Sequence, residues 1–348
     1  MSQIFAAETA DEAWSLAADA FKASDDVSIQ PSRDGVTREI LHASFVVRDP
    51  RQRWILSREP SLNPAFAIAE VVWILGGRND SRFVNHWNSA LPRFAGYGET
   101  YYGAYGYRLR CNFGFDQLNS AFKALSRNPS SRQVVLQIWD ARLDLPNNGE
   151  PRAPDIPCNI ASFLKVRDGR LEWAQILRSN DLVLGLPHNV VQFTFLQEVM
   201  AGWLEVELGQ YFQFSDSLHV YERDWESIRR ASRRILPISC DSLMLPKADA
   251  DSAWTELERR MSLMAGDSEL TLSKWRGIVN WTEAPEAFGN LLRIVAADDA
   301  RRRGWSIDSA QIANECSNPI LKSAWRLWLA RCSEHKQGWG NKAGQAHA

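Results

Sequence analysis

The pattern of hydrophobic and polar positions predicts two helices in the first part of the chain. Residues 9–12 read TADE, a capping box, and apolar residues follow it at helical spacing. A second helix is predicted over 65–75, where Asn63-Pro64 provides the start signal and a glycine pair ends the segment. This second segment is apolar on nearly every side, which is typical of a buried helix.

Strand patterns dominate the middle of the chain. Two apolar-rich runs, 159–166 and 171–179, flank an Asp168-Gly169 dipeptide. Asp-Gly between two such runs is typical of a β-hairpin turn. Residues 210–221 form a further run of strand character. The hairpin is the clearest local structure that the sequence predicts.

Helices and strands therefore intermix in the first part of the chain, and only helices follow. Residues 179–189 read as a loop and 190–204 as a mostly apolar helix. Beyond them the apolar positions have helical spacing only. This pattern predicts an α+β fold, a mixed β-sheet with packed helices, over residues 1–240. An all-helical region is predicted over 241–348.

Composition and charge narrow the class of protein. The chain has 348 residues and a net charge of −2, which favours neither a nucleic-acid nor a membrane partner. No apolar run is long enough to span a membrane, and the N-terminus lacks a secretory signal pattern. The five cysteines are scattered, so neither a disulfide framework nor a metal site is expected. These features predict a cytoplasmic protein.

Cys158 is the first candidate for chemistry. It stands between a proline and an asparagine where the first hairpin strand begins. One interpretation is a buried cysteine that fills a core. The other is a nucleophile, which needs a nearby cation to lower its thiol pKa. Arg178 ends the second hairpin strand, so the hairpin brings it to the same side of the sheet as Cys158.

Glu70 is the only charged residue in the apolar helix 65–75. Burying a carboxylate without a partner is costly. Two hypotheses remain open: Glu70 forms a structural pair with an arginine, or it has a raised pKa and transfers protons.

Other polar residues have both a functional and a structural interpretation. Residues 177–181 place a cation, a hydroxyl and a carboxylate in one loop, which suits a phosphate but also a solvated turn. Asn189 precedes an apolar helix and is also a good N-cap. His219 and Tyr221 share one face of a strand. They are either functional residues or half-buried residues of the core. None of these patterns identifies an activity by itself.

In this order and spacing, the candidates resemble the thymidylate synthase family, which includes the deoxycytidylate hydroxymethylases. The resembling core contains PCN, QILRSNDLVLGLPHNVVQF and DSLHVYERD, and weaker matches are AEVVWILGG, GAYGYRLR and SSRQVV. The resemblance covers roughly residues 10 to 240. It implies a thymidylate-synthase-like catalytic domain.

The resemblance also implies residue roles on the phosphate side of a pyrimidine nucleoside monophosphate. Cys158 would add as a thiolate to C6 of the ring and make C5 nucleophilic. Arg178 would lower the thiol pKa and bind the phosphate with Ser179. Arg33 would add a contact, and Arg132 would reach the phosphate of the other subunit of a homodimer.

Further roles concern the base, the sugar and proton transfer. Asn189 would read the base edge, which favours uracil because an amide can donate to O4 and accept from N3–H. His219 and Tyr221 would hold the sugar hydroxyl. Glu70 would shuttle protons through water, and Tyr105 would line the pocket.

The cofactor implied is 5,10-methylenetetrahydrofolate, with Asp181 holding its pterin. Departures from the family pattern include Asn159 in place of histidine, Gln133 in place of a second phosphate arginine, and Ser217 in place of aspartate. The family's short C-terminal tail is replaced by the helical region. A tightly closed site gives a methyl product, whereas water entering a looser site gives a hydroxymethyl product.

The leading hypothesis is thus one-carbon transfer to C5 of a uracil nucleotide such as dUMP. The alternatives are 5-hydroxymethylation of a uracil or cytosine nucleotide, and a nucleotide-binding homologue without turnover. A thiol hydrolase built on Cys158 and His219 leaves Arg178 and Asn189 without a role. The sequence leaves the product and the sugar open.

Overall fold

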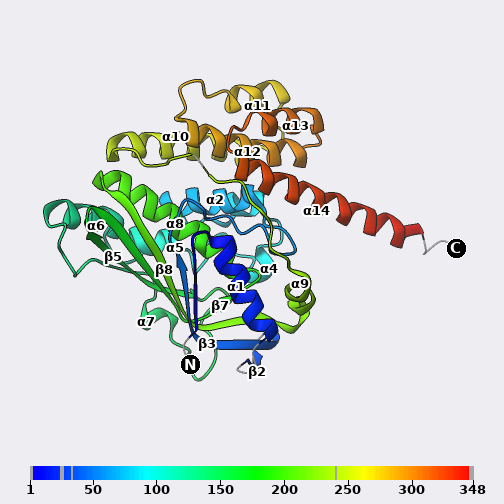
Figure 1. Ribbon diagram of the computed structural model, residues 1–348. Helices are drawn as coiled ribbons and strands as arrows, with labels where there is room; N and C mark the ends of the chain where they lie inside the picture. The colour runs from blue at the N-terminus through cyan, green and yellow to red at the C-terminus, as the bar shows by residue number, and fades with distance from the viewer. Residues whose placement is uncertain (1–2, 24–26, 33, 240, 345–348) are drawn as a thin grey trace.

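The computed structural model describes residues 3–23, 27–32, 34–239 and 241–344. Its centre is an eight-stranded mixed sheet in the order β1-β3-β8-β6-β5-β4, with β2 beside β3 and β7 beside β8 (Figure 1). The strands are β1 (Ile4–Ala7), β2 (Ser28–Ser32), β3 (Gly35–Val47), β4 (Val135–Gln137), β5 (Asn159–Arg167), β6 (Arg170–Leu177), β7 (Asn180–Asp181) and β8 (Glu207–Tyr221).

Helices pack on the sheet and form a separate layer beyond it. The α-helices are α1 (Ala10–Ala23), α2 (Pro64–Leu75), α3 (Ser81–Trp87), α4 (Pro92–Ala95), α5 (Tyr105–Tyr107), α6 (Gln117–Arg127), α7 (Ala141–Asp144), α8 (Gly185–Leu204), α9 (Trp225–Arg230), α10 (Lys247–Gly266), α11 (Leu272–Val279), α12 (Glu286–Arg302), α13 (Ser306–Glu315) and α14 (Pro319–Gly344). None of the helices in the described ranges combines the length and apolar character needed to cross a membrane.

Helices cover one face of the sheet and leave the other open. On β8, the alternate residues Tyr211, Gln213 and Ser215 are buried, and α8 packs against β6 and β8. Phe212, which points the opposite way, is 36% exposed. The pairing register continues this outer row through Ala174 of β6 into β5. The sheet therefore has an open face with apolar side chains on it.

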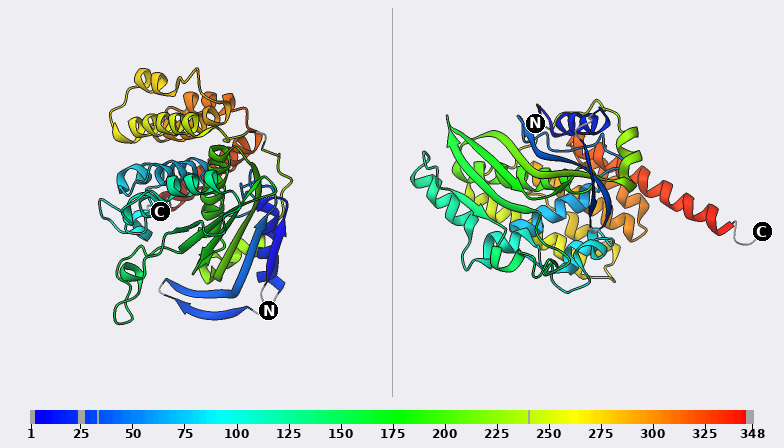
Figure 2. Two further views of the ribbon diagram at one scale, coloured as in Figure 1. Left: turned by 90° about the vertical axis from the view of Figure 1, so that its left-hand side faces the viewer. Right: turned by 90° about the horizontal axis from the view of Figure 1, so that it is seen from below.

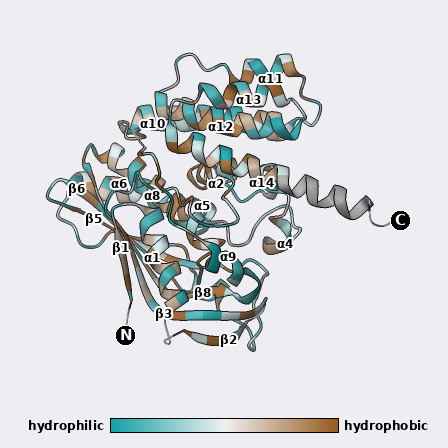
Figure 3. Cartoon of the chain, turned by 45° about the vertical axis from the view of Figure 1, so that its right-hand side comes forward, coloured by the Kyte–Doolittle hydropathy of each residue, from teal (hydrophilic) through white to brown (hydrophobic). Residues whose placement is uncertain are grey.

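The C-terminal helices form a second layer above α2. Both α10 and α12 pack on α2, and α8 packs on it as well. Figures 1 and 2 show this layer stacked on the sheet domain, with α14 extending away from the body. Figure 3 shows mixed teal and brown residues along α10–α13, as expected of helices with one buried face. Being enclosed between two layers explains why α2 is apolar nearly all round.

The predicted α+β class and its main elements are confirmed. The capping box forms, because Thr9 N donates to Glu12 Oε2 and Glu12 N donates to Thr9 Oγ1, both at 3.2 Å. The Asn63 side chain caps α2 by accepting from two backbone N–H groups. The hairpin turns at Asp168-Gly169, where both residues have positive φ.

One loop prediction is wrong. The sequence predicts irregular structure over 179–189, but β7 forms inside this segment and α8 begins at Gly185. Pro187 does not prevent this, because the first turn of a helix needs no partner for its backbone N–H groups. The boundary between 1–240 and 241–348 stays a prediction.

Candidate active site

Cys158 and Arg178 meet at the open end of the β5–β6 hairpin. The backbone N–H of Arg178 donates to the carbonyl of Cys158 at 3.0 Å. The Arg178 guanidinium donates from Nε to Pro157 O at 2.9 Å and from Nη2 to Ile156 O at 3.1 Å. It also lies over the Trp139 ring, 5.5 Å from the ring centroid. The cation is therefore held against the two residues that precede the cysteine.

Burial separates Cys158 from a core cysteine of the same chain. Cys158 is half-buried, whereas Cys316 is buried, and burial raises the pKa of the Cys316 thiol to about 11. A thiol that is reachable from solvent and close to a cation is the type that reacts. Cys158 is half-buried, and the Arg178 guanidinium is bonded to the two residues before it, so its surroundings differ from those of the buried Cys316.

Tyr105 lies where the groups of the site converge. Its hydroxyl interacts electrostatically with the Cys158 thiol and the Glu70 carboxylate, and it is hydrogen-bonded to the Asn159 side chain. Burial is the main reason why the pKa of Tyr105 is raised far above its usual value. The ring packs near Phe193 of α8, with centroids 6.1 Å apart. Tyr105 is thus a neutral hydroxyl that interacts with both Cys158 and Glu70.

Glu70 pairs with a histidine, so the hypothesis of an arginine partner is wrong. His188 Nδ1 lies 2.5 Å from Glu70 Oε2, and the two side chains are 20% and 18% exposed. The His188 ring also packs edge-on against Phe66, one turn before Glu70 on α2. The early start of α8 explains this pairing, since it turns His188 toward α2.

Asn189 is inside α8 and is not its N-cap, which is Leu184. Its Oδ1 accepts from Asn159 Nδ2 at 3.0 Å, and its Nδ2 donates to Asn180 Oδ1 at 3.1 Å. All three amides are buried. Hydrogen bonds on both sides thus fix the orientation of the Asn189 amide. A group that recognises a ligand needs a fixed orientation of this kind.

His219, Tyr221 and Asp181 gather beside Arg178. The rings of His219 and Tyr221 make an edge-on contact with centroids 5.3 Å apart, as their shared strand face predicted. The pKa of His219 is lowered, chiefly by burial and also by the Arg178 charge, although Asp181 and Glu39 oppose this. Burial likewise raises the pKa of Tyr221. His219 is therefore a neutral hydrogen-bonding group at pH 7.

Asp181 is anchored by the backbone that follows it. Its Oδ1 accepts from Val183 N at 2.7 Å and from Leu184 N at 3.2 Å. Strand pairing of β7 with β8 sets Asp181 opposite His219. Ser179 lies between Arg178 and β7 and is half-buried. Residues 178–181 thus follow one another directly from the end of β6 into β7.

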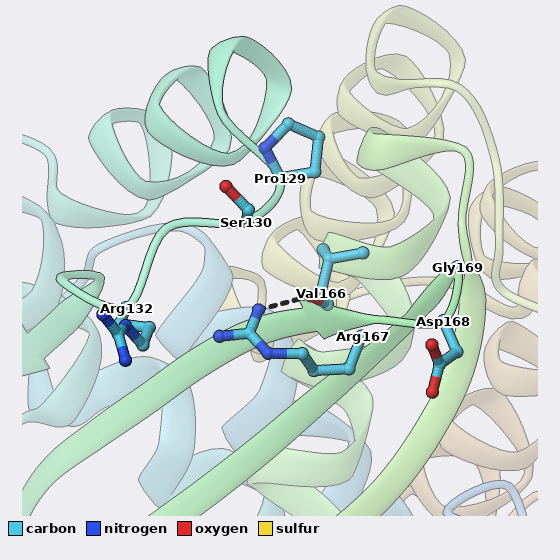
Figure 4. A pocket seen from close by; sticks show the side chains of 7 residues that line it. All are labelled: Pro129, Ser130, Arg132, Val166, Arg167, Asp168 and Gly169. Carbon is cyan, nitrogen blue, oxygen red and sulfur yellow. Dashed lines mark hydrogen bonds between the residues drawn. The ribbon is translucent and has the colours of Figure 1, made fainter.

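Arg132 does not join this group within one chain. It is exposed and lines a hollow of about 630 Å³ with Val166, Arg167 and Asp168 at the hairpin tip (Figure 4). The tip lies at the other end of β5 from Cys158, roughly 23 Å away at about 3.3 Å per residue. Arg33 lies outside the described residues.

Two residues that the sequence did not single out contact the candidate residues: His188 contacts Glu70, and Asn159 contacts Asn189. In the sequence, Asn159 stands out only as a departure from the family pattern. A cue for His188 was available, because a polar ring next to Asn189 at the start of an apolar helix needs a buried partner. Among the described residues, no group of three or more His, Cys, Asp or Glu side chains is placed to hold a metal ion.

Comparisons with known proteins identify relatives of this chain. The family model described as thymidylate synthase matches residues 27–255. The deoxyuridylate hydroxymethyltransferase of Bacillus phage SP01 is 31% identical over 255 residues, which cover 70% of this chain and 66% of that protein. The deoxyuridylate hydroxymethyltransferase of Pseudomonas phage M6 is 39% identical over 175 residues, 50% of this chain and 49% of that protein.

A third relative comes from a methanogen. The putative thymidylate synthase of Methanothermobacter marburgensis is 27% identical over 210 residues, 59% of this chain and 87% of that protein. The chain spans about half to two thirds of the length of the two phage relatives. The family model covers most of the α+β part, including Glu70, Cys158, Arg178 and His219. The chain therefore belongs to the thymidylate synthase family.

Proposed function

We propose that this protein transfers a one-carbon unit from 5,10-methylenetetrahydrofolate to C5 of dUMP and releases 5-hydroxymethyl-dUMP. The single observation that carries the choice of product is the contact between Glu70 and His188. The names of the two phage relatives support the same reaction. Methyl transfer, the other reaction considered for this site, shares the early steps. The two reactions differ at the last intermediate, to which water adds only in hydroxymethyl transfer.

The nucleotide would bind across the open end of the hairpin. Arg178 and Ser179 would hold its phosphate, and His219 and Tyr221 would hydrogen-bond the sugar hydroxyl. Asn189 would meet the base edge from α8. The closeness of His219 to Arg178, which appears as a lowering of the His219 pKa, supports a single binding surface.

Cys158 would open the reaction. Its thiolate adds to C6, and the electron pair moves to C5, which then forms a bond to the one-carbon unit. C5 loses its proton, and the bond between the one-carbon unit and the folate nitrogen breaks, leaving a methylene group on C5. Water adds to this methylene, and the sulfur leaves C6. The net change replaces the C5 hydrogen by CH₂OH.

Asp181 fits the role of the folate contact. When bound, 5,10-methylenetetrahydrofolate supplies the one-carbon unit. Asp181 Oδ1 is already engaged by Val183 and Leu184, which fixes the carboxylate and leaves Oδ2 to accept an N–H of a pterin. Asp181 is half-buried at the end of β7, so its position suits a flat ring that enters from solvent.

His188 and Glu70 would act on the water. With His188 Nδ1–H donating to Glu70, the lone pair on Nε2 would be available to accept a proton from water. A positioned base of this type accelerates a proton transfer by about 10²- to 10⁴-fold. The Glu70 carboxylate also interacts with Tyr105, whose hydroxyl is close to Cys158. This link through Tyr105 supports a role for the pair near the carbon that Cys158 would activate.

The sheet's open face supports a homodimer. Val135, Phe163 and Phe212 project from it and are 47%, 36% and 36% exposed. Side chains of this type on one face are typical of a protein interface. Arg132 is far from its own Cys158, so a contact between Arg132 and a bound phosphate would have to be made with the partner's site.

Incubation of the protein with 5-tritiated dUMP and 5,10-methylenetetrahydrofolate tests the proposal. We expect tritium release and a product that co-elutes with 5-hydroxymethyl-dUMP, and neither with Cys158→Ser. Thymidylate as the sole product would refute the hydroxymethyl assignment and retain one-carbon transfer. Absence of tritium release from the wild-type protein would refute the activity itself.

A further inference from the structure

A chain of buried side chains runs from the β5–β6 core to Asn189. Every member is at most 6% exposed, so none can exchange its partners for water at low cost. The hydrogen-bonded members, in order, are Ser162 and Trp173, then Gln175, Asn159, Asn189, Asn180 and Ser215. We call this set the amide relay.

Each amide in the relay donates with its nitrogen in the direction of Ser215. Gln175 Nε2 donates to Asn159 Oδ1 at 2.9 Å, and Asn159 Nδ2 donates to Asn189 Oδ1 at 3.0 Å. Asn189 Nδ2 donates to Asn180 Oδ1 at 3.1 Å, and Asn180 Nδ2 donates to Ser215 Oγ at 3.0 Å. Each amide offers its oxygen to one neighbour and its nitrogen to the other. If one amide exchanged the positions of its oxygen and nitrogen, all the other amides would have to do the same to keep their hydrogen bonds.

One member of the relay cannot reverse. Ser162 and Ser215 carry hydroxyls, and the Tyr105 hydroxyl beside Asn159 is of the same kind, so each can either donate or accept. Trp173 carries an indole N–H, which can only donate. It donates to Gln175 Oε1 at 3.2 Å, from two residues earlier on the same face of β6. This bond identifies Gln175 Oε1 as an acceptor and thereby sets the direction of the whole relay.

The direction matters for a pyrimidine base. Uracil presents O4 as an acceptor and N3–H as a donor, whereas cytosine presents an amino donor and N3 as an acceptor. An isolated asparagine could suit either base by turning its amide. Resting on the proposed function, we propose that Trp173 and Gln175 are positioning residues that hold the Asn189 amide in the orientation for uracil and so exclude dCMP.

Binding cytosine would require the reversed relay. Reversal ends with Gln175 Nε2 facing Trp173 Nε1, two donors without an acceptor between them. Binding dCMP would therefore leave a buried N–H donor without an acceptor. The cost of such a donor lowers the affinity for dCMP by about tenfold or more. Without the indole N–H, both directions satisfy every amide, and the barrier to dCMP disappears.

Trp173→Phe is the direct test, read by isothermal titration calorimetry with dUMP and dCMP in the absence of folate. We expect the ratio of the two dissociation constants to move about tenfold or more toward dCMP. Gln175→Met, which cuts the link between Trp173 and Asn159, should move the ratio in the same direction. A merely structural role would weaken both nucleotides alike and leave the ratio unchanged.

Tyr211→Phe is the matched control. It also removes a buried donor on this sheet, the hydroxyl that bonds Gln213 Oε1 at 2.8 Å, but it lies outside the relay. We expect it to keep the wild-type ratio. An unchanged ratio in both Trp173→Phe and Gln175→Met would overturn the relay while wild-type binding of dUMP still supports the proposed function. Wild-type protein that binds neither nucleotide would overturn both.

Discussion

Replacing His188 by phenylalanine tests how water is delivered. Phenylalanine keeps an aromatic ring against Phe66, whose centroid is 5.1 Å from that of His188. It removes the 2.5 Å contact to Glu70 and the nitrogen that would accept the proton of water. The perturbation is therefore chemical rather than steric.

The expected size of the effect follows from the geometry. A hydrogen bond to a charged group contributes about 1.5–3 kcal/mol, and these two side chains are largely shielded from solvent. Loss of a positioned base slows proton transfer by about 10²- to 10⁴-fold. We expect formation of 5-hydroxymethyl-dUMP by His188→Phe to slow about 100-fold or more. Stability should fall by about 1.5–3 kcal/mol, the contribution of the lost hydrogen bond, because Phe retains the ring contact.

Single-turnover kinetics separate the steps. Tritium leaves C5 before water adds, so its release by His188→Phe should stay closer to the wild-type rate than product formation does. His86→Phe is the matched control, since His86 Nε2 contacts Asp299 Oδ1 at 2.8 Å in the helical layer. It removes the same type of pair away from Cys158 and should leave both rates intact. Product formation by His188→Phe within about twofold of wild type would refute the role of His188.

Three further predictions address other parts of the site. Iodoacetamide should modify Cys158 and leave Cys316 unmodified, because burial raises the Cys316 pKa to about 11. Bound dUMP should protect Cys158 from modification. Peptide mass spectrometry that shows faster modification of Cys316 would contradict this prediction. The pKa of His219 is lowered in the folded state, so below about pH 6.5 the unfolded state binds more protons than the folded state. The free energy of unfolding should therefore fall by up to about 1.4 kcal/mol per pH unit, until the pH reaches the lowered pKa. His219→Asn should flatten this fall when urea denaturation is compared between about pH 7 and about pH 5.5, and an unchanged slope would show that another group titrates. Mixing inactive Arg132→Ala with inactive Cys158→Ala should restore tritium release if Arg132 acts across a dimer, whereas no recovery in mixed dimers would count against the shared site.

The sequence by itself determined what lies close along the chain. Cys158 and Arg178 lie at the two open ends of a hairpin that turns at Asp168-Gly169. Pairing of its two strands brings the residues together whatever the rest of the fold does. His219 and Tyr221 share a face because side chains alternate along a strand. The motifs that carried the family resemblance are local in the same sense.

Only the tertiary structure decided the partners that are distant in sequence. Glu70 and His188 are 118 positions apart, and their contact depends on how α2 packs against α8. A buried carboxylate requires a partner, but the requirement does not name one, so arginine was as reasonable as histidine. The direction of the Asn189 amide depends on β5, β6 and α8 meeting in register around Asn159 and Gln175. A pattern of single residues cannot encode that arrangement, because each amide takes its direction from neighbours that the fold alone brings within hydrogen-bonding distance.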